Sequence, residues 1–169
     1  ECGCALVKDA ALMRDSYSLV PSYLRDDRSL PWFSEFGIQQ SRGFRALKLW
    51  MVMQQVGVAG YREIISQNIT LTQILSQKIA SRPDFELVAT GPLSVACFRY
   101  MPAGVQDVDA FNRALVPIIQ NSGQAFITSA ELNGRPVLRS CIVNFRTTEA
   151  DLDALLQAVV TAGEMVVSP

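Results

Sequence analysis

Residues 85–100, FELVATGPLSVACFRY, determine the expected fold class, because hydrophobic and polar residues alternate along two short runs in this stretch. An alternation of period two is typical of β-strands, since successive side chains of a strand point to opposite faces of a sheet. The runs Phe85–Ala89 and Val95–Tyr100 are separated by Gly91-Pro92, a pair of residues that favours a turn. The stretch therefore predicts two neighbouring strands.

A helix and a second pair of strands are expected after these two strands. Hydrophobic residues recur at helical spacing over Asp107–Asn121, and Pro117 is expected to kink this helix. Two further strands, over residues 125–130 and 136–143, flank Asn133-Gly134, which is the preferred pair for a type I′ hairpin turn.

A last helix completes the C-terminal part of the chain. It is expected to begin at a cap formed by Thr148 and Asp151 and to end at Gly163. The order of elements from residue 85 onward is then ββαββα, which is typical of an α+β domain.

Two long helices are expected before this domain. Phe44 and Leu47 belong to a series of hydrophobic residues at helical spacing that starts at about residue 39, and Gly57 is expected to end that helix. A second helix is expected over Ala59–Ala80, with an apolar stripe along one side.

The N-terminal region is expected to hold a buried strand at Cys4–Asp9, followed by a long irregular loop over Ala10–Gly37. Loops of this length inside compact domains are uncommon and often act as functional lids. Tyr23, within VPSYL, is the candidate for chemistry there, because a tyrosine hydroxyl on a closing lid can donate a proton once water is excluded. The alternative is that Tyr23 is an exposed or packing aromatic residue.

Two further residues are candidates for binding. Arg139 lies in an otherwise apolar predicted strand, where its charge either binds a substrate carboxylate or pairs with an internal Asp or Glu. Ser41 begins the run SRGFRALKLW, in which it can cap a helix while the basic residues form a solvated helix face.

Composition excludes several classes of function. The 169 residues include 15 Lys+Arg, 16 Asp+Glu and no histidine, and this balance argues against binding to nucleic acid or anionic membranes. Without histidine, catalysis has to use Tyr, Lys, Arg, Cys or carboxylates, or a cofactor. The sequence contains no run of roughly 18 apolar residues, so no membrane span is predicted. The four cysteines, at positions 2, 4, 97 and 141, lack the spacing of a metal site and are expected to be buried and reduced in a cytoplasmic protein.

The sequence resembles the pyridoxal-phosphate-dependent group II amino-acid decarboxylases, which include the aromatic-L-amino-acid and glutamate decarboxylases. The resemblance extends over essentially the whole chain and rests on the ordered blocks CGCA, VPSYL, SRGFRALKLW, FELVATGPLSVACFR and PVLRSCIVN. It implies the α+β C-terminal small domain of a fold-type-I enzyme of the transferase-like class that uses pyridoxal 5'-phosphate (PLP). By this resemblance, residues 1–38 end the large domain and carry the mobile lid, 39–83 form spine helices, and 84–169 form the small domain.

The resemblance also implies that the cofactor is bound mainly by a segment upstream of this chain. In the family, the Schiff-base lysine, a histidine that stacks on the pyridine ring and an aspartate that pairs with its nitrogen all lie upstream. None of Lys8, Lys48 and Lys78 matches the Schiff-base lysine. The chain alone is therefore expected to be inactive, with no cofactor-binding residue assigned.

Three residues receive roles from the resemblance. Tyr23 matches the mobile-loop tyrosine that protonates the substrate Cα after carbon dioxide leaves, reaching across a dimer interface. Arg139 matches a small-domain arginine that holds a substrate carboxylate. Ser41 falls where the neighbouring subunit approaches the substrate or the phosphate, whereas Gly43 departs from the family, in which a second arginine is usual.

The implied function is thus part of a PLP-dependent L-amino-acid decarboxylase, which is expected to be a cytoplasmic homodimer. The amino acid is not fixed, although Ser41 favours an aromatic substrate. Two alternatives stay open: a non-catalytic dimerisation or regulatory fragment, and the small domain of another fold-type-I PLP enzyme such as an aminotransferase.

Overall fold

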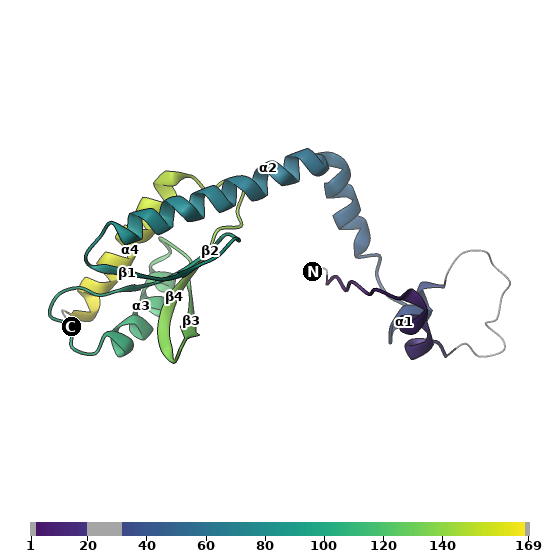
Figure 1. Ribbon diagram of the computed structural model, residues 1–169, viewed down its shortest axis with the longest axis horizontal. Coiled ribbons are helices and arrows are strands. Elements are labelled where there is room, and N and C mark those ends of the chain that lie inside the picture. The colour runs from purple at the N-terminus through teal and green to yellow at the C-terminus, as the bar shows by residue number, and fades with distance from the viewer. Residues whose placement is uncertain (1–2, 20–31, 168–169) are drawn as a thin grey trace. The chain divides into compact units, whose positions relative to one another are not determined.

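The computed structural model describes residues 3–19 and 32–167 of the chain, which divides into two compact units, Glu1–Gly57 and Val58–Pro169 (Figure 1). Helix α2 (Ala46–Ala80) contains the boundary at Gly57, where φ is 71° and ψ is 169° and the helical geometry is interrupted. A positive φ favours glycine. The prediction that Gly57 ends the first long helix is therefore confirmed, although this helix begins at Ala46 rather than near residue 39.

The second unit contains a four-stranded antiparallel sheet (Figure 1). Its strands are β1 (Phe85–Thr90), β2 (Val95–Tyr100), β3 (Thr128–Leu132) and β4 (Arg135–Cys141), arranged in the order β1-β2-β4-β3. Both predicted pairs of strands are confirmed, with ends that differ by a few residues. Between β3 and β4, Asn133 and Gly134 both have positive φ, at 53° and 74°, as a type I′ turn requires.

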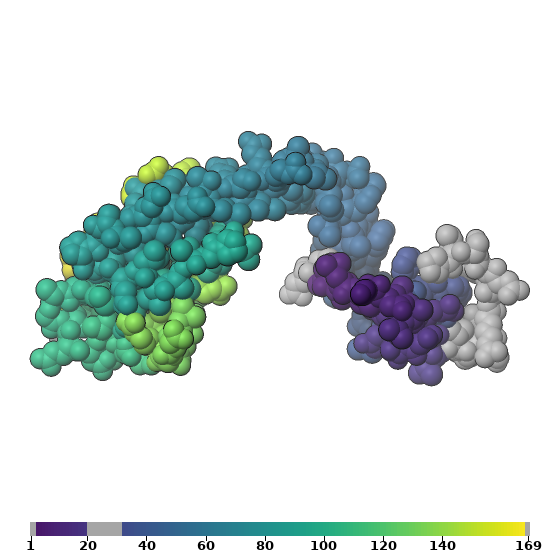
Figure 2. Space-filling view, viewed as in Figure 1, coloured from purple at the N-terminus to yellow at the C-terminus, as the bar shows by residue number. Residues whose placement is uncertain are grey.

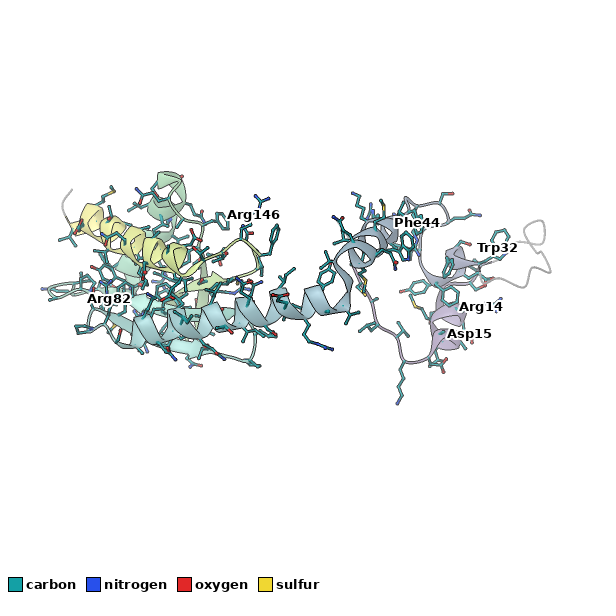
Figure 3. All side chains as sticks on the ribbon, turned by 90° about the horizontal axis from the view of Figure 1, so that it is seen from above. Arg14, Asp15, Trp32, Phe44, Arg82 and Arg146 are labelled. Carbon is teal, nitrogen blue, oxygen red and sulfur yellow. The ribbon has the colours of Figure 1, made fainter. Side chains whose placement is uncertain are left out.

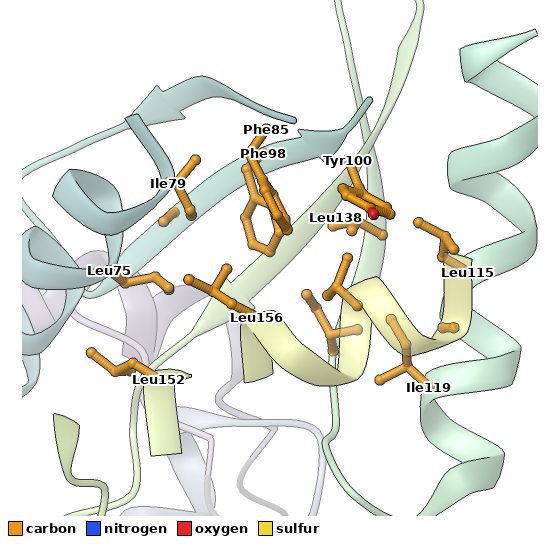
Figure 4. Packing of buried hydrophobic residues seen from close by; sticks show 14 of the residues in the cluster. Leu75, Ile79, Phe85, Phe98, Tyr100, Leu115, Ile119, Leu138, Leu152 and Leu156 are labelled. Carbon is orange, nitrogen blue, oxygen red and sulfur yellow. The ribbon is translucent and has the colours of Figure 1, made fainter. Parts of the chain in front are cut away.

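Three helices cover one face of this sheet: α3 (Val108–Ser122), α4 (Glu149–Val167) and the C-terminal part of α2. The strand register pairs Leu87 with Phe98 and Phe98 with Leu138, so these side chains share the face that carries the core. Figure 4 shows Leu75, Leu115 and other helix residues packed around Phe98 and Leu138. The close packing of this unit is also visible in the space-filling view (Figure 2). The structure confirms the expected α+β class, and α3 continues through Pro117.

Helix α4 begins at the predicted cap. The backbone N–H and the hydroxyl of Thr148 both donate hydrogen bonds of 2.8 Å to the Asp151 carboxylate. Lys78 of α2 then joins the two helices, because its Nζ lies 2.8 Å from Asp153 and 3.1 Å from Glu149. The predicted end of the helix is wrong: Gly163 lies inside α4, which continues to Val167, and it packs against Tyr100 and Phe111.

The first unit contains α1 (Ala10–Tyr17), the short 3₁₀ helix η2 (Phe33–Phe36) and the start of α2. Asp9 caps α1 by accepting a hydrogen bond from the Ala11 N–H. The predicted strand at Cys4–Asp9 is wrong, because these residues form no strand in the structure. A strand needs a hydrogen-bonded neighbour, and no strand in the described part of the chain pairs with these residues. The loop expected over Ala10–Gly37 is helical in both of its described parts.

Hydrophobic side chains surround the first half of α2. Leu49, Trp50, Met51 and Val52 are consecutive residues, so they point in different directions around the helix, and between 45% and 58% of each is exposed. A helix that is hydrophobic on every side is normally covered by other protein surfaces. Among the described residues, no helix is long and apolar enough to cross a membrane.

Candidate functional site

The first unit contains a cavity of about 860 Å³ at the start of α2. Side chains that can form hydrogen bonds line much of it. They are the hydroxyls of Ser34 and Ser41, the amides of Gln39 and Gln40, and the guanidinium groups of Arg42 and Arg45. Two aromatic residues, Phe33 of η2 and Phe44 just before α2, complete the lining (Figure 3 labels Phe44). Of the two predicted site residues that the structure describes, Ser41 lines this cavity and Arg139 does not.

The cavity has a positive charge. Arg42 and Arg45 line it, and none of its described lining residues carries a carboxylate. Neither guanidinium group has a hydrogen-bonding or charged partner in the part of the chain that the structure describes. The acidic residue next to it in sequence, Glu35, is already paired with Arg14 of α1, at 2.6 Å between Nε and Oε2, and it also accepts a hydrogen bond from Ser18 (Figure 3 labels Arg14). The cavity is therefore suited to an anion.

The backbone before α2 explains the position of these side chains. The Arg45 N–H donates to the Gly43 carbonyl at 2.8 Å, and the Leu47 N–H donates to the Phe44 carbonyl at 3.2 Å. Helix α2 begins only at Ala46, so the prediction that Ser41 caps the helix is wrong. Gly43, where the family usually has an arginine, brings no charge to the cavity, but Arg45 does.

Arg139 lies in the other unit, on β4, with its side chain exposed. Its register neighbours are Cys97 on β2 and Thr128 on β3. Within residues 3–19 and 32–167, its guanidinium forms no ion pair, so no described Asp or Glu provides the internal pairing that was one of the two alternatives. The desolvation cost that motivated the prediction does not arise, and the carboxylate-binding role stays a prediction.

The buried arginine is Arg99 of β2, which is 4% exposed. It forms an ion pair with Asp109 of α3 and lies 3.8 Å from Glu86 of β1, which also binds Arg135 of β4 at 2.7 Å. This network joins four elements of the second unit, β1, β2, β4 and α3. Sequence reasoning missed Arg99, although it stands in an apolar predicted strand just as Arg139 does.

The cysteines and lysines show no sign of a catalytic arrangement. Cys97 is buried, and burial raises the pKa of its thiol, whereas Cys4 and Cys141 are exposed, so the prediction of four buried thiols is wrong. Cys2 lies outside the described residues. The described part of the chain contains no group of His, Cys, Asp or Glu that could hold a metal.

Each lysine lies away from the cavity lining. Lys8 and Lys48 are exposed, and hydrogen bonds from Lys78 to Asp153 and Glu149 raise the pKa of Lys78 and keep it charged. Tyr23, the predicted proton donor, lies outside the described residues.

A family model described as the pyridoxal-dependent decarboxylase conserved domain matches residues 1–101. An aromatic-L-amino-acid decarboxylase of Bacillus atrophaeus is 30% identical over 97% of this chain and 36% of its own length. A tryptophan decarboxylase of Camptotheca acuminata is 29% identical over 91% of this chain and 32% of its own length. The chain thus spans about a third of the length of these curated relatives.

Solved structures share the fold. The crystal structure of Oryza sativa TDC with PLP and tryptamine has a TM-score of 0.82 at 24% identity, and it covers 95% of this chain and 35% of its own. That of Catharanthus roseus tryptophan decarboxylase in complex with L-tryptophan has a TM-score of 0.77 at 23% identity, over 94% of this chain and 34% of its own. The expected fold class is confirmed.

Proposed function

The chain belongs to the pyridoxal-dependent decarboxylase family, and we propose that it is the C-terminal part of an enzyme that converts an L-amino acid into an amine and carbon dioxide. The observation that carries the proposal is the family match over residues 1–101, a stretch that includes the described cavity. The fold alone would not be enough, because a cysteine desulfurase of Escherichia coli also aligns, with a TM-score of 0.51.

PLP is the cofactor of this family, and when bound it withdraws electrons from the substrate Cα so that the bond to the carboxylate can break. The cavity of the first unit is positive and lined by hydroxyl and amide groups, which fits the anionic groups of the cofactor or substrate. No lysine lines it. We therefore propose that an upstream segment of the same enzyme supplies the lysine that bonds to the cofactor, and that this chain is inactive alone.

Three residues of this chain have proposed roles. Tyr23 donates a proton to the substrate Cα after decarboxylation, Arg139 binds the substrate carboxylate, and Ser41 contacts the substrate or the phosphate. The cationic lining around Ser41, which has no carboxylate among its described residues, supports its assignment. The guanidinium of Arg139 is exposed and has no acidic partner within residues 3–19 and 32–167, so it is available for an anion. An aromatic amino acid is the proposed substrate, in line with the named relatives.

The proposed assembly is a cytoplasmic homodimer. Residues 1–38 would end the large domain with its lid, residues 39–83 would form the spine and residues 84–169 the small domain. The exposed hydrophobic side chains of the first half of α2 support an assignment of the spine to an interface with a large domain or a second subunit.

The test is a product assay on the full-length enzyme with aromatic amino acids and added PLP. Release of carbon dioxide with an equal amount of amine supports the function, whereas transfer of the amino group without carbon dioxide points to an aminotransferase. We expect Tyr23→Phe to divert product from amine toward aldehyde, with Tyr61→Phe, on α2, as the matched control. An unchanged amine yield in Tyr23→Phe would refute the role of Tyr23 while leaving the family activity intact.

A further inference from the structure

We propose that Arg42 and Arg45 together bind one oxyanion, either the phosphate of the cofactor or, in place of Arg139, the carboxylate of the amino-acid substrate. The inference rests on the proposed function for the identity of these two ligands, but not for the existence of the anion site. It assigns the binding to a pair of arginines.

Both guanidinium groups line one cavity of about 860 Å³. Small-molecule sites in proteins have volumes of roughly 300–1,000 Å³, so this cavity can admit a ligand the size of a vitamin-derived cofactor or an aromatic amino acid. Arg42 and Arg45 also belong to the same short segment before α2, so the two charges reach the cavity from nearby positions of the backbone.

The charge of the two arginines is not compensated by the described residues that surround them. None of the described residues that line the cavity carries a carboxylate, and Glu35 is held by Arg14 and Ser18. Two guanidinium groups without partners among the described residues repel each other, and an oxyanion between them removes that repulsion. Each can also present two parallel N–H donors to a phosphate or carboxylate, which a lysine cannot do.

The local backbone holds the pair in place. The hydrogen bond from the Arg45 N–H to the Gly43 carbonyl, 2.8 Å long, closes a tight turn over residues 43–45, directly after Arg42. Arg42 folds back over Gly37, because a Cβ added to this glycine would lie 3.7 Å from its Nη1. The turn thus fixes the backbone between the two arginines.

The aromatic part of the lining narrows the class of ligand. Phe33 and Phe44 provide flat apolar surfaces beside the two charges. An oxyanion carried by a planar ring satisfies both features, since rings pack on aromatic side chains while the anion binds the arginines. The pyridine phosphate of the cofactor and an aromatic amino acid both have this combination.

The experiment measures dissociation constants for the full-length enzyme by calorimetry, with ligand pairs that differ in the oxyanion. Deoxypyridoxine phosphate, which lacks the reactive aldehyde, is compared with deoxypyridoxine, and L-phenylalanine is compared with phenethylamine. The proteins are the parent, Arg42→Gln, Arg45→Gln and the double variant. Arg113→Gln, an exposed arginine on α3, is the matched control.

We expect the double variant to weaken binding of one oxyanion-bearing ligand by at least about tenfold, the scale of a lost hydrogen bond to a charged group. The dissociation constant of the matching ligand without the oxyanion should change less than about twofold. In the Arg113→Gln control, the dissociation constants of all the ligands should also change less than about twofold. The Arg42→Lys, Arg45→Lys double variant, which keeps the charge, should recover part of the affinity. The ligand pair whose affinities change shows whether the bound oxyanion belongs to the cofactor or to the substrate.

Equal affinities for parent and double variant with both oxyanions would overturn the inference, even if the enzyme decarboxylates its substrate. Conversely, tight arginine-dependent binding in a protein that releases no carbon dioxide would keep the anion site and reject the proposed function. The two failures are therefore distinguishable.

Discussion

Gly163 of α4 lies so close to the ring of Tyr100 of β2 that a Cβ atom at position 163 would come within 2.5 Å of Cε1 of the ring. The ring of Phe111 on α3 lies 3.1 Å from the same point. A glycine inside a helix is usually unfavourable, so its presence here reflects packing rather than helix propensity.

Gly163→Ala should therefore destabilise the protein. Its methyl group must displace buried aromatic rings, and overpacking of this kind typically costs about 1–3 kcal/mol. Urea unfolding should show a lower midpoint for this variant than for Gly91→Ala, where an added Cβ meets no atom within 4 Å. Equal midpoints for the two variants would contradict the close approach.

Asn112→Ala should also destabilise the second unit. The buried Asn112 side chain accepts a hydrogen bond from the Tyr100 N–H and donates to the Tyr100 carbonyl, each at 2.9 Å. The truncation leaves both backbone groups buried without a partner, at a cost of roughly 2–4 kcal/mol. The exposed Asn121 on the same helix provides the control, since Asn121→Ala should change the free energy of unfolding by less than about 0.5 kcal/mol.

The cap of α4 should give stability that depends on pH. Hydrogen bonds from the backbone and the hydroxyl of Thr148 hold the pKa of Asp151 below its ordinary value of 3.8. A carboxyl with a lowered pKa stabilises the fold above the pKa of the unfolded state and loses this contribution as the pH falls through the folded-state pKa.

We therefore expect Asp151→Asn to lower the urea midpoint at neutral pH and to make progressively less difference as the pH falls below 3.8. The exposed Glu164 on the same helix serves as a control through Glu164→Gln. A difference between parent and Asp151→Asn that is the same at neutral and acid pH would show that the carboxylate charge is not involved.

Arg139→Gln should raise the KM of the full-length enzyme for its amino acid by about tenfold or more, because a bidentate contact to the substrate carboxylate is lost. The exposed side chain of Arg139 makes a folding defect in this variant unexpected. Steady-state kinetics of Arg139→Gln and Arg113→Gln would test the role, and an unchanged KM in the former would remove Arg139 from the site.

The elements that sequence predicted well are those with local signals. The hairpin at Asn133-Gly134, the helix break at Gly57 and the cap at Thr148 each depend on a few adjacent residues, and all three are present. A glycine near the end of a hydrophobic helical pattern, such as Gly163, is an equally local signal for a helix end. Here the glycine is instead required by its contact with Tyr100 of β2, so the prediction of a helix end was wrong.

The site was harder to predict for the same reason. An apolar strand with one arginine suggests a buried charge, yet Arg139 is exposed while Arg99 is buried, and only the positions of Glu86 and Asp109 distinguish the two. Similarly, the basic residues after Ser41 were consistent with a solvated helix face. The cavity emerges only when η2 lies beside the residues that precede α2.

The hydrophobic surface around the first half of α2 has a consequence for how the protein is made. A segment that exposes Trp50 and Met51 by more than half attracts chaperones and tends to self-associate until another surface covers it. The yield of folded protein should therefore depend on how quickly this part of the helix is covered after synthesis.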